Sequence, residues 1–309
     1  MLRIFTSPMA WGPPRVGRLA LLPTLLVLLL SGGASAAPTP AESAIALQNK
    51  YRNLSRQADK NQFQRPLYLE STESPSALAG DIYAVMDHPF SATQATFGNA
   101  ANWCDVLILH INTKYCQASP TAAGTALAMR IGGKHPEALE RAQLMTFDFR
   151  ASTPGPDYFE AELRADKGPL STSNYRIHLE AVPVPGGKTL LHLRYAYEVG
   201  TMGRLAMQGY LATMGRGKVG FTLAGAPVDG QDTYIGGVRG VVERNTMRYY
   251  LAIDAYLGAL SAPREQQFEQ RIERWFGATE QFPRQLHEVD RTAYLTMKRE
   301  ENRRQQATP

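Results

Sequence analysis

The sequence predicts an α+β fold in which antiparallel strands in series precede one long helix. Between residues 127 and 199, apolar and polar residues alternate in successive short segments, most regularly at 191–199. Turns rich in Pro, Gly and Ser join these segments, so neighbouring strands are expected to run in opposite directions. From residue 240 to 260 the apolar residues recur at helical spacing instead, and Gly258 and Pro263 mark the end of that helix.

Shorter elements precede the predicted sheet. Residues 41–64 have a polar helical pattern, which predicts a short helix packed on the main domain. Residues 66–76 indicate a polar connector or an edge strand, and residues 78–87 indicate a strand. Two short helices then lead into the sheet, and the second carries Trp103 on its apolar stripe.

Further helices follow the long one. Two amphipathic patterns, around residues 264–276 and 283–297, predict a C-terminal helical extension. The charged run at 298–304 mixes basic and acidic residues, and we interpret it as a solvated tail. After its leader the chain is therefore divided into residues 37–76 (helical segment and connector), 77–260 (sheet and long helix) and 261–309 (helical extension).

The N-terminus has the features of a secretory signal peptide. Residues 1–36 contain three arginines and no acidic residue, then the apolar run of 19–30, then small residues ending in Ala34-x-Ala36. The apolar run is interrupted by Pro23 and is too short for a comfortable spanning helix, which takes about 20 residues. We therefore predict cleavage near Ala36 and a periplasmic or secreted protein. The alternative is an uncleaved membrane anchor.

The charge balance argues against a nucleic-acid partner. The full chain has a formal net charge of +5, and removal of the three leader arginines lowers it to +2. The stretch Gly215-x-Gly217-x-x-Gly220 has the letters of a dinucleotide-binding turn. However, a helical pattern precedes it and a short strand or loop follows it, which reverses the order that the motif requires. We interpret these glycines as a turn after a helix and predict no cofactor.

The order of elements resembles the helix-grip fold of the START-like superfamily, which includes the polyketide cyclases. The resemblance lies in residues 80–107, for the first strand and helix pair, and in residues 239–260, for the long helix. It implies a curved antiparallel sheet wrapped around the long C-terminal helix, with extra N- and C-terminal helices in this chain. An insertion at 202–236 departs from the pattern and predicts an additional helix and hairpin near the cavity mouth.

The resemblance also implies an apolar cavity between sheet and helix that holds a lipid or another hydrophobic small molecule. Aromatic walls with a few hydroxyl groups suit such a ligand, although the same rings would also fill a solid core. Arg248 is assigned to a ligand head group, and its alternative role is to anchor the helix to loops. The predicted ligand-binding residues are Trp103, Phe147, Phe149, Phe159, Tyr195, Tyr197, Arg248, Tyr249 and Tyr250.

No catalytic or metal-binding residue is predicted. The six histidines form no H-E-x-x-H pair, and no G-x-S-x-G motif occurs. His178 and His192 are expected as a surface pair on adjacent strands. The sequence therefore predicts a periplasmic binding or carrier protein for a hydrophobic small molecule or lipid, with transient membrane contact. Two alternatives stay open: a cavity enzyme of the cyclase or hydrolase type, and an envelope protein-interaction module.

Cys104 and Cys116 are the only cysteines of the chain. Because an exported protein meets oxidising conditions, such a pair is a disulfide candidate. On one continuous helix their Cα atoms would lie ~18 Å apart, whereas a disulfide needs less than ~7 Å. The bridge therefore requires that the second short helix ends near His110 and that the chain turns back. The alternative is two buried free thiols.

Overall fold

The computed structural model describes residues 12, 38–56, 61–213 and 215–307. The predicted signal peptide and its cleavage site lie outside the described residues, apart from Gly12, and both stay predictions. From Pro38 onward the chain forms one compact unit.

The strands and helices follow the predicted order. The strands are β1 (Leu67–Glu73), β2 (Ala77–Met86), β3 (Thr113–Thr121), β4 (Gly124–Ile131), β5 (Gln143–Gly155), β6 (Tyr158–Lys167), β7 (Thr172–Val184) and β8 (Lys188–Val199). The helices are α1 (Pro40–Ser55), α2 (Phe90–Phe97), α3 (Ala100–Leu107), α4 (Thr201–Ala212), α5 (Gly237–Gly258), α6 (Arg264–Thr279), α7 (Pro283–Leu286) and α8 (Arg291–Ala307), with the 3-10 turns η2 (Leu139–Arg141) and η3 (Pro169–Ser171).

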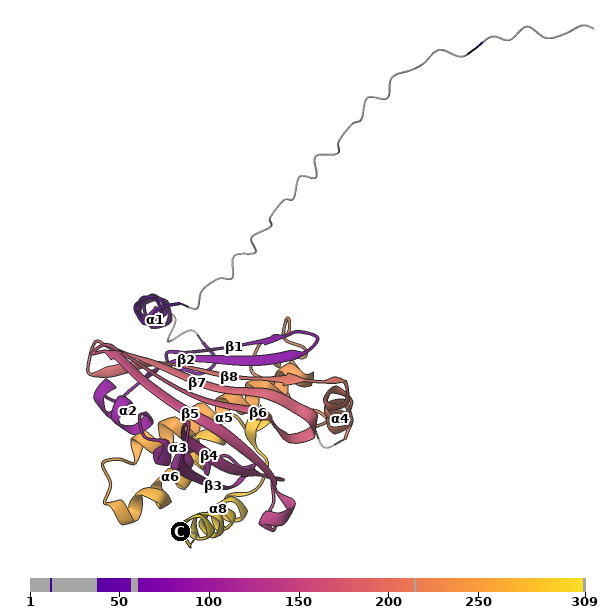
Figure 1. The fold of residues 1–309 in the computed structure, drawn as a ribbon. Helices are drawn as coiled ribbons and strands as arrows, with labels where there is room; N and C mark the ends of the chain where they lie inside the picture. The colour runs from indigo at the N-terminus through magenta and orange to yellow at the C-terminus, as the bar shows by residue number, and fades with distance from the viewer. Residues whose placement is uncertain (1–11, 13–37, 57–60, 214, 308–309) are drawn as a thin grey trace, which may run out of the picture. The chain divides into compact units, whose positions relative to one another are not determined.

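The eight strands form one antiparallel sheet in the order β1-β2-β8-β7-β6-β5-β4-β3. Strands that follow one another along the chain are paired, except that α2 and α3 separate β2 from β3, and β2 pairs with β8 instead. The sheet curves, and α5 lies along its inner side (Figure 1). The expected fold class is confirmed: an α+β protein whose antiparallel sheet grips a long helix in the C-terminal half.

One glycine sets how closely α5 approaches the sheet. A Cβ atom at Gly80 of β2 would lie 2.3 Å from Oγ1 of Thr246 on α5, so only glycine fits there. Because side chains alternate along a strand, Ile82 faces α5 as well, whereas Asp81 faces away. Tyr195 pairs with Gly80 and shares its inner face. The inner residues are almost fully buried, and each large aliphatic one contributes about 1.5–3 kcal/mol by burial.

The outer face of the sheet is partly covered by α1. Thr39 and Glu42 form a capping box that begins this helix, since each side chain bonds the backbone N–H of the other residue. Leu47 and Leu54 are the buried residues of the helix. They pack on the outward side chains of Tyr158, Val182, Val184 and Leu190. The predicted N-terminal helix is therefore present, and its apolar side is matched by an apolar strip on the sheet.

The edge strand and the C-terminal helices refine the prediction. Residues 67–73 form an edge strand rather than a connector, because they pair with β2 along their whole length. The helical pattern of residues 283–297 is split into α7 and α8, since the backbone leaves the helical conformation at His287.

The charged run at 298–304 continues α8, and its interpretation as a solvated tail is wrong. Lys298 and Glu301 are fully buried. Lys298 Nζ donates to the carbonyls of His110 and Thr113, at 2.7 and 3.0 Å, and pairs with Glu301 at 2.7 Å. Lys114, also buried, pairs with Glu301 at 3.1 Å. Buried charges are tolerated here because each finds opposite charge or carbonyl oxygens.

The insertion at 202–236 contains α4 and a short hairpin held by the bridges Leu223–Tyr234 and Val228–Gln231. Gly220 lies where this insertion touches α5. A Cβ at Gly220 would lie 2.4 Å from Glu243 Oε2 and 3.0 Å from the Cα of Gly240. The glycine is therefore required for close packing of a loop on a helix.

The carboxylate of Glu243 fixes the insertion to α5. It is fully buried and accepts hydrogen bonds from the Phe221 N–H (2.6 Å), the Thr222 N–H (2.9 Å) and the Thr222 hydroxyl (2.7 Å). The hydroxyl of Ser71 on β1 donates a fourth bond at 2.6 Å. Such a buried carboxylate is stable only because its donors are all in place.

The predicted disulfide is confirmed. Cys104 lies on α3 and Cys116 on β3, with their Cα atoms 5.1 Å apart. The helix ends at Leu107, and the chain turns back through residues 108–112 as the bridge requires. The bond ties α3 to the edge strand at the far end of the sheet from β1.

Replacing both cysteines by serine should lower the free energy of unfolding by about 2–3 kcal/mol, because the unfolded chain then loses a short closed loop. Chemical denaturation of both proteins measures this. Thiol titration of the denatured, unreduced parent protein should find no reactive thiol, and two per chain would contradict the bridge.

Candidate functional site

Four tyrosines meet on the inner face of the sheet, against α5. They are Tyr175 on β7, Tyr195 and Tyr197 on β8, and Tyr249 on α5. The ring centroids of Tyr175 and Tyr197 are 5.0 Å apart, and those of Tyr195 and Tyr249 are 5.2 Å apart. Each side chain is at most 9% exposed. Three predicted site residues are thus brought together, and Tyr175 completes a tyrosine cluster.

The tyrosine cluster stays uncharged at physiological pH. Burial raises the pKa of all four phenols, and contacts among the rings raise the pKa of Tyr195 and Tyr249 further. A neutral phenol can donate and accept hydrogen bonds. The Tyr175 hydroxyl donates to Thr172 Oγ1 at 2.8 Å, because the Thr172 hydroxyl already donates to the Pro169 carbonyl. Aromatic faces with several neutral hydroxyls suit a mostly apolar molecule that has a polar end.

The other predicted aromatic residues are spread through the core. Trp103, Phe147 and Phe159 are buried in the same apolar cluster as the tyrosines. The Trp103 indole N–H donates to the Phe97 carbonyl at 3.0 Å, which satisfies its polar atom. Phe149 is half-buried and lines a hollow on the surface near the α2–α3 turn.

Two predicted residues of α5 have partners away from the tyrosine cluster. The Tyr250 hydroxyl accepts a hydrogen bond from Arg65, which also pairs with Asp254 at 3.4 Å. Arg248 Nη2 binds Glu288 Oε1 at 2.7 Å. Glu288 lies just before α8, so this contact matches the anchoring role that the sequence left open for Arg248.

His110 lies beside the tyrosine cluster, where its ring stacks on that of Tyr249 with the two ring centroids 4.8 Å apart. Burial lowers its pKa well below the usual range, and the charges of Arg248 and Lys298 act in the same direction, so the ring is neutral. Nδ1 accepts the Asn112 N–H at 3.2 Å, which places the ring proton on Nε2. Nε2 makes no hydrogen bond of good geometry among the described residues, although the Asn245 side chain lies close enough to the ring to favour its charged form. A buried donor is therefore available next to the cluster.

A second polar cluster lies on the outer face, beneath α1. His192 contacts Glu180 Oε2 through Nδ1 at 2.7 Å and Asp81 Oδ1 through Nε2 at 2.9 Å. Because both ring nitrogens face carboxylates, both must donate, and the ring is an imidazolium stacked on Tyr83 at 4.2 Å. The expected surface position of His192 is wrong: it is 8% exposed, and with Lys50 of α1 it borders a small hollow.

The charged groups of this cluster shift one another's pKa values. Burial opposes the charged form of His192, but the two carboxylates raise its pKa. Burial also acts against ionised Glu180, yet the bonds from His192 and Tyr158 lower its pKa to about 2. The pKa of Asp81 is lowered in the same way by His192 and Arg194.

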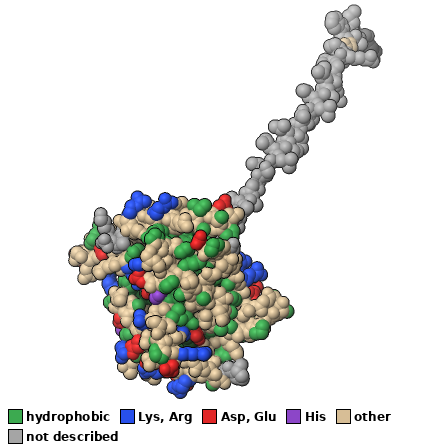
Figure 2. All heavy atoms as spheres, turned by 90° about the vertical axis from the view of Figure 1, so that its left-hand side faces the viewer, with side chains coloured by type: hydrophobic (Ala, Val, Ile, Leu, Met, Phe, Trp, Pro, Cys, Tyr) green, Lys and Arg blue, Asp and Glu red, His purple; other side chains and the backbone are tan. Residues whose placement is uncertain are grey.

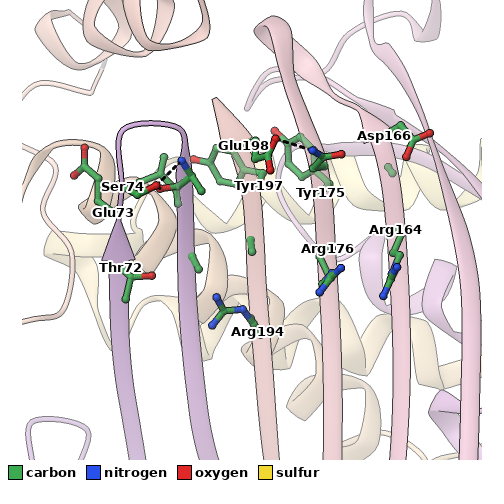
Figure 3. Close-up of a pocket in the computed structure, with 16 residues that line it drawn as sticks. Thr72, Glu73, Ser74, Arg164, Asp166, Tyr175, Arg176, Arg194, Tyr197 and Glu198 are labelled. Carbon is green, nitrogen blue, oxygen red and sulfur yellow. Dashed lines mark hydrogen bonds between the residues drawn. The ribbon is translucent and has the colours of Figure 1, made fainter. Parts of the chain in front are cut away.

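A groove of about 540 Å³ lies near the ends of β1, β2, β6, β7 and β8 (Figure 3). In that view α5 lies behind the sheet, and Arg164, Arg176 and Arg194 stand side by side on neighbouring strands. Tyr175 and Tyr197 also belong to its lining. The groove and the tyrosine cluster are therefore at the same end of the sheet.

Sequence reasoning missed several of these residues. Tyr175 lies two positions before Ile177 on the recognised apolar row, so extending the alternation by one step would have found it. Asp81 and His192 are 111 residues apart, and no local pattern joins them.

Metal binding, membrane spans and surface charge also bear on the sequence predictions. The described residues include no group of three or more His, Cys, Asp or Glu side chains placed to hold a metal ion. In the same part of the chain, no helix is both long and apolar enough to cross a bilayer. Basic and acidic side chains are intermixed on the face shown in Figure 2. That face therefore has no basic stripe of the kind that marks a nucleic-acid surface.

Comparison with known proteins gives similarity in structure but not in sequence. No protein-family model matches the chain, and no curated protein is similar to it in sequence. The chain resembles human StAR-related lipid transfer protein 5 at 9% identity, over 56% of this chain and 89% of that one, with a TM-score of 0.31. It resembles a protein from Arthrobacter aurescens at 11% identity, over 62% and 92%, with a TM-score of 0.33. The lipid transfer and protein localization domain of human StarD13 matches at 6% identity, over 57% and 91%, with a TM-score of 0.29.

At these identities and TM-scores the similarities add no argument of their own. The START-like resemblance is confirmed at the level of the fold, by the strand order and by the position of α5 on the inner face of the curved sheet.

The outer-face cluster predicts a pH dependence of stability. Since the pKa of His192 is raised by folding, its contribution is fully present below the unfolded value of 6.5 and is lost as the pH rises through the folded-state pKa. The lowered pKa values of Glu180 and Asp81 act oppositely, so their contribution is present above about 4.5 and is lost in acid. His192→Gln should cost about 1–3 kcal/mol near pH 6 and should remove the alkaline loss.

Denaturation curves between pH 3 and 9 test this, with His178→Gln as the control. His178 lies on the same face, is more exposed, and makes one longer contact with Glu160 at 3.7 Å. Equal effects of the two substitutions would contradict the special role of the doubly bonded ring.

Proposed function

We propose that this chain is an exported carrier that holds a lipid or another hydrophobic small molecule between the sheet and α5. The observation that supports this most is the tyrosine cluster: four neutral, buried phenols gather on the inner face of a sheet that grips a helix. Their faces bind apolar groups, and their hydroxyls bind a polar end. The ring centroids lie about 5–6 Å apart, so the rings have to separate when a ligand enters.

Export agrees with the chemistry of the described residues. The N-terminal sequence predicts a cleaved signal peptide, and the bond between Cys104 and Cys116 is of a kind that persists in oxidising compartments. A carrier in the periplasm or outside the cell has its cargo source in a membrane, so it must meet a lipid surface.

The insertion supplies a surface for this meeting. Met202 and Leu205 on α4 are 68% and 62% exposed, and Leu223 and Val228 on the hairpin are exposed as well. No acidic residue occurs from 199 to 228, whereas the segment contains three basic residues. Arg204 holds α4 to the β1–β2 turn through the carbonyls of Ser74 and Pro75. An apolar, acid-free surface fits an anionic bilayer, since both burial and charge favour contact.

The cavity-enzyme alternative is favoured by one observation, the neutral His110 stacked on Tyr249. Its proton lies on Nε2, because Nδ1 already accepts the Asn112 N–H. This arrangement suits hydrogen-bond donation to a ligand oxygen better than proton abstraction, and so agrees equally with a carrier. The interaction-module alternative relied on the C-terminal helices, of which α6 and α8 pack on α5 and β3.

The first test is to purify the full chain from the cell envelope, extract it with organic solvent and identify the extract by mass spectrometry. We expect about one lipid-like molecule per chain and a mature N-terminus near Ala37. Tyr195→Trp should weaken binding of an apolar fluorescent probe about tenfold, because the larger ring occupies space that the ligand needs. Since the rings separate to admit a ligand, the substitution should lower the free energy of unfolding less than overpacking of a solid core does. In a solid core the same overpacking costs about 1–3 kcal/mol.

Tyr68→Trp is the matched control, since Tyr68 lies on the edge strand and is 39% exposed. An empty extract together with no saturable probe binding would refute the carrier function. A mature protein that begins at Met1 would refute cleavage of the predicted signal peptide.

The second test concerns the membrane surface. The double substitution Met202→Ser with Leu205→Ser should lower co-sedimentation with anionic vesicles about tenfold, because two exposed apolar side chains no longer insert. Leu144→Ser is the control, because Leu144 is 52% exposed on β5. Vesicle binding that is equal in all three proteins would rule out α4 as the docking element.

A further inference from the structure

The groove in Figure 3 is lined by arginines that take no part in the tyrosine cluster. It lies on the outer face, because Ala79 is next to the inward Gly80 on β2, and Ala196 is next to the inward Tyr195 on β8. These two alanines pair with each other and form its floor. Two small side chains in adjacent strands leave a hollow where longer ones would fill the surface.

Three guanidinium groups stand beside this floor. The register aligns Ala196 with Arg176 on β7, and Arg176 with Arg164 on β6. Arg194 lies two residues from Ala196 on β8, so its side chain is on the same face. Two arginines directly opposite one another repel, and a sheet that keeps such a pair accepts a local cost.

The arginines are only partly neutralised. Glu162 is shared, because Nε of Arg164 lies 2.6 Å and Nε of Arg176 lies 3.0 Å from its two oxygens. Arg194 uses Nη1 to bind Asp81, at 2.7 Å, and Asp81 is also the partner of His192. No partner occurs among the described residues for the Nη groups of Arg164 and Arg176. The guanidinium groups of Arg164 and Arg176 therefore present N–H donors beside the hollow.

The acidic residues at the rim do not cancel this charge. Glu73 pairs with Arg204 at 3.4 Å, and Glu198 accepts a hydrogen bond from the Asn174 amide at 2.6 Å. A third carboxylate, Asp166, also lines the groove. All three carboxylates lie toward the strand ends, as Figure 3 shows, and away from the arginine row. The groove is thus basic along one side and polar along the other.

From this geometry we infer that the groove is a binding site for a phosphate ester, with the phosphoryl group on Arg164 and Arg176 and the remainder of the molecule over Ala79 and Ala196. Guanidinium forks match the oxygens of phosphate in pairs, and a phosphoryl group has enough oxygens and charge for more than one arginine. The volume of about 540 Å³ exceeds that of a phosphate ion, so it also admits a polar remainder such as a glycerol or sugar. The site lies on the opposite face of the sheet from the tyrosine cluster and does not rest on the carrier function.

Titration of the full-length mature chain with glycerol 3-phosphate, by calorimetry at low ionic strength, tests the site. Saturable binding is expected, and Arg176→Gln or Arg164→Gln should lower its affinity about tenfold, as loss of a charge-assisted hydrogen bond does. Ala196→Leu keeps every charge but fills the hollow, and it should weaken binding as strongly. Added salt should weaken binding as well.

Arg299→Gln is the matched control, since Arg299 is 47% exposed, close to the 48% of Arg176, and pairs with one carboxylate on another part of the surface. A parallel titration with dihexanoyl phosphatidylglycerol, kept below its micelle concentration, separates the two sources of a phosphate ester. Binding of glycerol 3-phosphate supports a free phosphate ester, and arginine-dependent binding of the short lipid alone supports a lipid head group. No binding of either, or binding that all the variants share, would overturn the inference.

Discussion

The burial of α5 on nearly all its sides is the constraint on which the rest of the structure depends. Fifteen of its 22 residues are buried, including the charged Glu243, Arg244 and Arg248. A charge in such a place is stable only with a partner. The insertion after β8 provides amide and hydroxyl donors for Glu243 and the Val219 carbonyl for Arg244. The C-terminal segment provides Glu288 for Arg248. The two additions to the helix-grip core thus complete the environment of its central helix.

The two faces of the sheet solve different physical problems. The inner face excludes water, so its tyrosines stay neutral and their hydroxyls keep hydrogen-bonding capacity in an apolar setting. The outer face carries charged side chains and is partly covered by α1. His192 is buried there and is held as a cation between two carboxylates. One sheet therefore offers an apolar, aromatic site on one side and an ionic groove on the other.

The end of the sheet near the insertion is where these features come together. Tyr175 and Tyr197 belong both to the tyrosine cluster and to the groove lining, and Arg204 ties α4 to the neighbouring β1–β2 turn. A carrier needs an opening, a surface that meets the source of cargo, and an interior that accepts it. Under the proposed carrier function, the surface that meets the source of cargo and the interior that accepts it lie on neighbouring elements.

The sequence by itself determined the local structure and much of the order of elements. The alternation at residues 191–199 fixed which side chains face inward, and the helical spacing at 240–260 fixed α5, because both periods follow from backbone geometry. It also indicated the two cysteines as a disulfide candidate, since the chain between them could turn back, but it left two free thiols open. What the tertiary structure decided is which polar groups meet. The runs that looked solvent-exposed, at Lys298 and His192, are buried because α8 and α1 fold onto partners far away in the chain. Pairings across more than a hundred residues depend on the packing of whole elements, and residue spacing does not encode them.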